Sequence, residues 1–394
     1  MSAQAGAADR LNTKVLDSLA AIDAAAGAWR DLETRCEGGL TYFQTLSWCR
    51  NWVAHFSREG RVTPHIRTVW RGDVMVAVWP LMVNVGRLGV RRLECLGDPH
   101  TQYANMLCDA AEDARIVTHL LMDGLEREAR CDVVVLNAVP AHSPLGRVLK
   151  ARNPRAAEDN AAAILDLSGF ASPQAYLDSL GKSQKRNRNR RLNRLSRFGA
   201  LDFAVLWPGD PDYAAHLATC MAMKRRWLRE TGRYSTGFAF RGYEAFLASL
   251  EGDAESRTGA CLAVLSCDGR AVAAELGFIR HGHFYSYIGG FDWDLRDYSP
   301  GKVIMGMVVA WLIENRVSAY DLLGNPADYK QSWSNRAVPL GAHAIARSWR
   351  GRIYAGAWLR GLRPAAKRFY GAVPETLRKL ATVGQGLGCI LLWV

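Results

Sequence analysis

The sequence lacks the patterns that mark several common protein classes. Its 394 residues include nine cysteines, an odd number at irregular spacing with no CxxC pair, so neither a disulfide framework nor a zinc ribbon is indicated. Nowhere do about 18 apolar residues run together, and Asp9 and Arg10 fall where a signal peptide would need an apolar run. We therefore expect a cytoplasmic protein, with peripheral contact at the inner face of the membrane left open.

Signatures of nucleotide binding and hydrolysis are also missing. The sequence contains no GxxxxGK[ST], GxSxG or HExxH, which removes the commonest P-loop, serine-esterase and zinc-protease interpretations. The stretch "GQGLG" at residues 384–388 follows no predicted strand and opens no predicted helix, so it is not a dinucleotide fingerprint. No metal site is predicted.

Positive charge is concentrated in two segments. The chain has 50 Lys and Arg against 38 Asp and Glu, a net charge of +12. Residues 182–197 contain eight basic residues and no acid, and residues 347–379 contain nine basic residues and Glu375 alone. Each segment contributes +8, so the rest of the chain is mildly acidic and the two basic segments need a separate explanation.

The same order of strand, loop and helix signals occurs twice. The first copy comprises strands at 65–70, 74–83 and 91–97, a loop at 98–105, a helix at 114–129 and a strand at 132–139. The second comprises strands at 261–267, 271–280 and 283–291, a loop at 292–301, a helix at 302–316 and a strand at 319–324. This repeat predicts an α/β fold of two tandem units, with mixed twisted sheets flanked by helices.

The predicted organisation has five segments. They are a disordered N-terminus (1–12), a degenerate first unit (13–165), basic connecting helices (166–200), a second unit (201–345) and a basic amphipathic tail (346–394). The tail mixes arginines with aromatic residues, which is typical of a helix on an anionic membrane surface and equally of a helix packed on the protein body.

A strongly basic helix is predicted from about Gln184 to Phe198. Leu192, Leu195 and Phe198 recur every three residues, and basic residues fill the other face. Because like charges three or four residues apart repel, a counter-charge is expected. Nucleic acid is disfavoured, since no aromatic residue lies among the arginines and no recognised nucleic-acid module accompanies them. A solvated face and a phosphate-bearing ligand both stay open.

The strongest local signal is the junction between the strand at 283–291 and the helix that follows. Ser299, Pro300 and Gly301 form a turn at the start of that helix, with Lys302 beside it. A helix N-terminus presents unpaired amides and the positive end of the helix dipole, so the junction predicts a pyrophosphate site.

Residues 15–345 resemble the CelD-like acetyltransferases, a tandem branch of the GNAT superfamily related in architecture to the FemAB transferases. The motifs that carry the resemblance are "YFQTLSWCRNWVAHF", "VAVWPLMV" and "ECLG" in the first half, and "YLDSLGKSQKRNRNRRLNRL", "YSPGK" and "YDLLGNPADYKQSW" in the second. The usual superfamily loop has Gln or Arg three residues before its first Gly and a small residue two after it. This sequence has Tyr298 and Val303 there.

The resemblance implies acyl transfer from acetyl-coenzyme A, or another acyl-coenzyme A, to an amine or hydroxyl. The acceptor would be a small-molecule or lipid-linked sugar of envelope or exopolysaccharide assembly. The pyrophosphate cradle falls on Ser299, Pro300, Gly301, Lys302 and Val303. The pantetheine arm would lie between the strand before this loop and the strand after the helix.

Attack on a thioester needs a group that takes up the nucleophile's proton and an acid for the leaving thiolate. We predict catalytic roles for Tyr329, Asp321 and Asp292. Substrate-binding roles are predicted for Lys330, Glu275, Arg186 and Arg190. Each has a structural alternative: the aspartates can cap turns, Tyr329 can pack beneath Trp333, and the charged residues can be solvated or internally paired.

Two other functions are compatible with the same residues. A FemAB-type enzyme would transfer an amino acid from aminoacyl-tRNA to a peptidoglycan precursor, and the basic helix would then contact RNA. A non-catalytic adaptor, derived from an acyltransferase and held at the membrane by its tail, is the alternative outside the enzymes.

Overall fold

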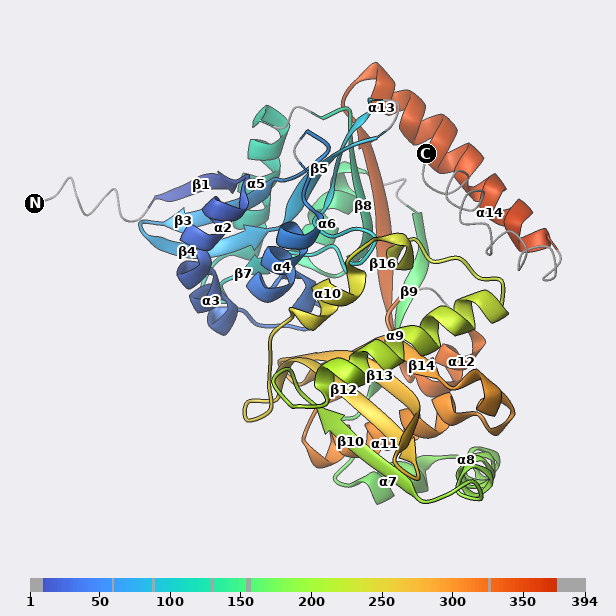
Figure 1. Ribbon diagram of the computed structural model, residues 1–394. Coiled ribbons are helices and arrows are strands. Elements are labelled where there is room, and N and C mark those ends of the chain that lie inside the picture. Colours follow the sequence, from blue (N-terminus) through green and yellow to red (C-terminus); the bar gives the residue numbers. More distant parts are fainter. Residues whose placement is uncertain are drawn as a thin grey trace, which may run out of the picture. The chain divides into compact units, whose positions relative to one another are not determined.

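The computed structural model describes residues 10–58, 60–86, 89–128, 131–153, 157–324 and 327–373 (Figure 1). It divides into two compact units, one containing the described residues up to 161 and those of 338–373, the other residues 162–337. The architecture is mixed α/β, with sheets flanked by helices, as the repeated element order predicts. Residues 1–9 lie outside the described ranges, and strand β1 begins at Leu11, within the segment predicted to be disordered.

The first unit begins with a hairpin-rich half. Its elements are β1 (Leu11–Leu16), α2 (Leu19–Ala24), α3 (Ala26–Arg35), η1 (Tyr42–Gln44), α4 (Leu46–Phe56), β2 (Val62–Pro64), β3 (Ile66–Arg71), β4 (Val74–Trp79), β5 (Leu81–Val85), β6 (Arg91–Cys95), β7 (Leu107–Cys108), α5 (Ala114–Glu128), β8 (Val133–Pro140) and α6 (Pro144–Arg152). β16 (Arg336–Ala346) enters this unit late in the chain, followed by α13 (Trp349–Ile353), the π-helical η4 (Tyr354–Leu362) and α14 (Arg363–Ala372).

Two sets of strands form the first unit. One has the order β1-β3-β4-β7 and the other the order β16-β8-β6-β5-β2. The β6–β8 pair is parallel, and α5 lies between these two strands in sequence, which is the crossover expected for a parallel pair. The core of this unit gathers apolar side chains from β3, β4, β6, β8, α5 and α6.

The second unit contains the basic helix and the second copy of the repeat. Its elements are α7 (Pro173–Ser179), α8 (Lys182–Leu195), β10 (Leu201–Leu206), α9 (Tyr213–Glu230), η2 (Gly237–Ala239), α10 (Tyr243–Ala248), β11 (Gly252–Asp253), β12 (Thr258–Cys267), β13 (Arg270–Arg280), β14 (His283–Phe291), η3 (Trp293–Tyr298), α11 (Pro300–Glu314), β15 (Ala319–Asp321) and α12 (Asp328–Trp333). The end of β9 (Ala157–Asp166) pairs with β15.

The central sheet of the second unit is antiparallel except at one place. Its order is β10-β12-β13-β14-β15-β9, and only β14 and β15 are parallel. Helix α9 packs on one face, where Gly290 approaches the Cys220 carbonyl. The next residue, Phe291, points to the opposite face and packs in the core that α11 completes, because successive side chains of a strand alternate.

Candidate active site

Strands β14 and β15 separate soon after they meet. They pair in parallel only from His283–Tyr285 on β14 to Ala319–Asp321 on β15. β14 continues to Phe291, and among the described residues no strand pairs with this side of it beyond Tyr285. Beyond Tyr285, this edge of β14 has no neighbouring strand among the described residues, so an extended ligand with amide groups could pair there as a strand does.

Helix α11 begins after β14 and the short helix η3, and most of its first amides already donate hydrogen bonds. Ser299 adopts a left-handed conformation (φ 58°, ψ 47°) before the first helical residue, Pro300, which has no N–H. The amides of Lys302 and Val303 both donate to the Ser299 carbonyl, at 2.9 and 3.2 Å. Of the five residues predicted as a cradle, Gly301 alone therefore offers an amide to a ligand.

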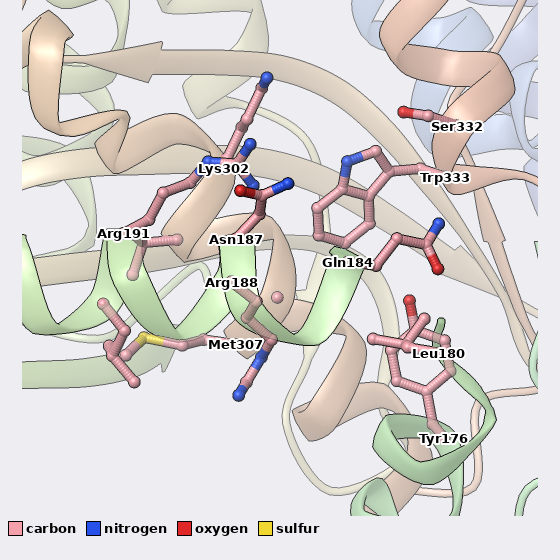
Figure 2. A pocket seen from close by; sticks show the side chains of 13 residues that line it. Tyr176, Leu180, Gln184, Asn187, Arg188, Arg191, Lys302, Met307, Ser332 and Trp333 are labelled. Atoms are coloured by element: carbon pink, nitrogen blue, oxygen red, sulfur yellow. The ribbon is translucent and has the colours of Figure 1, made fainter. Parts of the chain in front are cut away.

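A pocket of about 260 Å³ lies beside the first two turns of α11 (Figure 2). It is lined by Tyr176, Leu180, Gln184, Asn187, Arg188, Arg191, Leu192, Lys302, Val303, Gly306, Met307, Ser332 and Trp333, and we call it the cationic pocket. These residues come from α7, α8, α11 and α12, except Leu180, which follows α7 directly. The lining holds three cations, two side-chain amides and an indole ring, and no carboxylate, so it suits an anionic ligand with an aromatic or apolar part.

Two arginines of α8 flank the buried edge of that helix. Arg188 and Arg191 each precede a leucine by four residues, and Leu195 is completely buried while Leu192 lines the pocket. Burial, together with the neighbouring Arg190 charge, lowers the pKa of Arg191. A bound anion would stabilise the charged form of Arg191 by supplying a counter-charge.

The structure distributes the arginines of α8 differently from the sequence prediction. Arg186 and Arg190, predicted to bind substrate, are exposed and do not line the pocket. Arg188 and Arg191 line it instead, and sequence reasoning missed both. The available signal was their spacing of four residues from Leu192 and Leu195, since residues four apart share a helix face.

A second group of polar residues lies around the β13–β15 end of the sheet; we call Glu275, Tyr320, Asp321, Tyr329 and Lys330 the polar cluster. Glu275 is only 3% exposed, and the Tyr320 hydroxyl donates to its Oε1 at 2.7 Å. Burial raises the pKa of Glu275, while hydrogen bonds from Ser286 and Tyr320 lower it in part. A carboxyl group in this setting can exchange a proton nearer to neutral pH than an exposed one.

Asp321 and Lys330 are held at the end of β15. Asp321 is fully buried, its Oδ2 lies 2.9 Å from His283 Nε2, and its Oδ1 accepts the Leu323 amide at 2.7 Å. Lys330 donates from Nζ to the carbonyls of Leu323 and Gly324. Burial lowers the pKa of Lys330 to about 8, against the opposing effect of Asp321. Asp321 is thus placed to orient its neighbours rather than to meet a substrate directly.

Helix α12 connects the polar cluster to the cationic pocket. Tyr329 and Trp333 lie four residues apart on it, and Trp333 lines the pocket. Tyr329 is 46% exposed, so a substrate can reach its ring. Desolvation and the nearby Glu275 charge raise the pKa of Tyr329, which keeps its hydroxyl protonated and able to donate at neutral pH.

Asp292 lies in a different environment from the other predicted catalytic residues. It caps η3, accepting the Asp294 amide at 3.1 Å, and it forms an ion pair with Arg270. Arg226 Nη1 lies 3.7 Å from its other oxygen. These contacts account for a buried carboxylate at this position without a role in catalysis.

Comparisons with known proteins relate part of the chain to a described family. Residues 182–331, which extend from α8 into α12, match the family model described as "Acetyltransferase (GNAT) domain". A search of curated proteins found no match to the sequence.

Two solved structures share the fold over most of their length. FemX is 10% identical, with a TM-score of 0.59 over 87% of this chain and 99% of that chain. The C-terminal domain of a putative lysylphosphatidylglycerol synthetase from Agrobacterium fabrum is 14% identical, with a TM-score of 0.54 over 85% of this chain and 94% of that one. The chain therefore contains, at residues 182–331, a domain of the acetyltransferase (GNAT) type.

Proposed function

We propose that this protein transfers an acyl group, acetyl in the simplest case, from acyl-coenzyme A to an amine or hydroxyl of a sugar or envelope and exopolysaccharide precursor. The observation that carries the proposal is the cationic pocket at the start of α11. Arg188, Arg191 and Lys302 line it without any carboxylate. The CelD-like resemblance supplies the acceptor class.

The pocket suits the phosphates of coenzyme A. Two arginines and a lysine can hold a diphosphate there by charge-assisted hydrogen bonds. Of the five residues predicted as a cradle, only Lys302 and Val303 line the pocket. Trp333 offers a flat apolar surface for the less polar part of the ligand. The edge of β14 beyond Tyr285, which has no neighbouring strand among the described residues, suits an extended pantetheine arm.

The polar cluster supplies groups for the chemical step. Glu275 is the candidate general base, since burial raises its pKa toward neutrality. Tyr329, which stays protonated, is the candidate donor to the leaving thiolate. Lys330 carries a charge that can hold an anionic acceptor, and Asp321 positions both His283 and the turn after β15.

Ligand-induced thermal stabilisation tests the donor site. Coenzyme A and acetyl-coenzyme A should raise the melting temperature of the full chain, because a ligand that binds only the folded state stabilises it. Inorganic pyrophosphate and nucleotide sugars serve as comparisons. No stabilisation by any coenzyme A species would contradict the proposal. Turnover of radiolabelled acetyl-coenzyme A with candidate sugars then tests the acceptor class.

A second candidate is FemAB-type aminoacyl transfer from aminoacyl-tRNA to a peptidoglycan precursor. It is favoured by the exposed arginines of α8, Arg186, Arg190 and Arg194, whose charges suit the phosphates of an RNA backbone. Transfer from charged tRNA that RNase treatment abolishes, without stabilisation by coenzyme A, would establish this candidate. Binding of coenzyme A with no turnover on any acceptor would instead indicate a non-catalytic adaptor.

A further inference from the structure

The C-terminal helical segment, residues 347–373, is attached to the first unit along one side. The Tyr354 hydroxyl accepts from Arg92 Nη1 at 2.8 Å, and Ala355 is 6% exposed against Val133 and Val135. A Cβ added to Gly351 would lie 1.8 Å from the Asp132 carbonyl oxygen, so this turn touches the body closely. Figure 1 shows α13 and α14 in one long helical run.

The other side of the segment carries large apolar side chains in solvent. Trp349 is 63% exposed, Ile353 59%, Leu362 60% and Phe369 72%. We call these four residues the apolar stripe. They are half of the eight large apolar side chains that are exposed among the described residues, although they span only 21 positions. Such a concentration marks an interaction surface rather than the usual scatter of single residues.

The π-helical stretch η4 aligns the stripe. Ile353 and Leu362 are nine residues apart, which in an α-helix would place them on opposite sides. The stretch Tyr354–Leu362 is π-helical, with more than four residues per turn, so nine residues make roughly two turns. Trp349 and Ile353 are four apart, and Leu362 and Phe369 are seven apart, so all four fall near one line.

The charge of residues 347–373 indicates which kind of surface the apolar stripe contacts. Residues 347–373 contain seven basic residues, and no acidic residue occurs between Asp328 and Glu375. Arg350, Arg352 and Arg368 are exposed, and the Arg350 guanidinium lies over the Trp349 ring. A second copy of the chain would place these cations against one another, whereas a surface of lipid phosphates would neutralise them.

We propose that the apolar stripe and its flanking arginines dock this protein on an anionic lipid surface, with the segment lying in the plane of the interface. Among the described residues, no helix has the length and apolar content needed to cross a bilayer. An interfacial helix needs neither: it inserts an apolar face by a few ångströms and holds lipid headgroups with its basic residues. This docking goes beyond the proposed acyl transfer and does not depend on it.

Vesicle sedimentation of the full chain tests the docking. We expect wild-type protein to bind vesicles of phosphatidylcholine with phosphatidylglycerol. Its affinity for pure phosphatidylcholine vesicles should be at least tenfold lower. The triple variant Ile353→Ser/Leu362→Ser/Phe369→Ser should lose at least tenfold in vesicle affinity. The matched control is Val74→Ser/Ile116→Ser, which removes two side chains of similar exposure elsewhere in the first unit and should bind like wild type.

The arginines are tested separately. Arg350→Gln/Arg352→Gln/Arg368→Gln should weaken binding to anionic vesicles by at least tenfold, and raised salt should have the same effect on wild type. All variants should melt within a few degrees of wild type, because the changed side chains are exposed. Equal binding to neutral and anionic vesicles, or full binding by the stripe variant, would overturn the proposal. So would a wild-type dimer that the stripe variant dissociates in sedimentation analysis without vesicles.

Discussion

The hydroxyl of Tyr320 donates to Oε1 of Glu275 at 2.7 Å, and both side chains are buried. The bond joins β13 to β15, which lie on either side of β14. It holds the carboxyl group where β14 begins to separate from β15. It also opposes part of the cost of burying a carboxylate. The fold therefore both positions Glu275 and raises the pKa of its carboxyl group.

Replacing Glu275 by Gln should separate its stability effect from its chemical role. Because the folded pKa of Glu275 is raised, the wild type loses stability as pH rises through that pKa, and Glu275→Gln should not. The variant should therefore gain stability relative to wild type as pH rises above the ordinary pKa of a glutamate, while transfer falls by about 10²-fold or more. Chemical denaturation and initial rates across this range provide the measurement. A variant with unchanged rate would remove Glu275 as the base.

The two sets of arginines on α8 should behave differently. Arg188→Gln/Arg191→Gln removes two pocket cations and should weaken coenzyme A binding by at least tenfold, since charge-assisted hydrogen bonds to phosphate contribute about 1.5–3 kcal/mol each. Arg186→Gln/Arg190→Gln, on the exposed face, is the control and should stay within about threefold of wild type at physiological salt. Calorimetric titration measures both. Equal losses would indicate a general charge effect and no specific site.

Some features of α8 could be predicted from its sequence, and others could not. Periodicity predicts the helix and its basic face. The start of the preceding helix, α7, follows from its N-cap residue and from Pro173 at its first position. Which arginines face the ligand could not be predicted, because that depends on how Leu192 and Leu195 pack against α11. Local pattern places a residue on a helix face, and tertiary packing decides what that face meets.

The same limit applies to the acidic residues. The order of strands and helices around the α11 junction follows from hydrophobic runs and turns, and the structure confirms it. In the sequence, Asp292 falls just after the strand at 283–291 and Asp321 falls within the strand predicted at 319–324, so both could flank a site at the same edge of the sheet. Only the fold shows that Asp292 pairs with Arg270 while Asp321 lies beside His283. The catalytic and binding roles assigned to these residues stay predictions, as does the division into five segments.

Gly306 offers a way to fill the cationic pocket without changing its charges. A Cβ at this position would lie 3.8 Å from Arg188 Nε and 3.9 Å from the Trp333 ring, which is ordinary contact. Gly306→Ala should therefore bind coenzyme A and gain up to about 1 kcal/mol from helix propensity. Gly306→Leu should fold but lose the ligand-induced rise in melting temperature. If the leucine variant binds coenzyme A as wild type does, the ligand lies elsewhere.

Lys330 should give the protein a characteristic alkaline dependence of stability. Its folded pKa, about 8, is below the usual value of 10.5, so between these values the unfolded state binds more protons. Stability from this group therefore rises with pH above about 8, by up to about 1 kcal/mol per pH unit. Lys330→Met should lack this rise. Denaturation of both proteins between pH 7 and 9.5 checks it, and parallel pH curves would contradict the prediction.

Two glycines in the C-terminal segment form a matched pair that tests how the segment is held. Gly351 touches the body, since an added Cβ would meet the Asp132 carbonyl oxygen at 1.8 Å, whereas Gly356 has no atom within 4 Å. Gly351→Ala must move the helix or Asp132 and should cost about 1–3 kcal/mol. Gly356→Ala should be neutral or slightly stabilising.

Limited proteolysis distinguishes local release of the segment from global unfolding in these variants. We expect Gly351→Ala to speed cleavage within residues 347–373 more than elsewhere, because the contact it disrupts also positions Tyr354 against Arg92. Gly356→Ala should be cleaved at the wild-type rate. If both variants are cleaved alike, the segment is not anchored through Gly351. Its orientation on a lipid surface would then have to be set by other contacts, since only a fixed helix presents Trp349, Ile353, Leu362 and Phe369 in one direction.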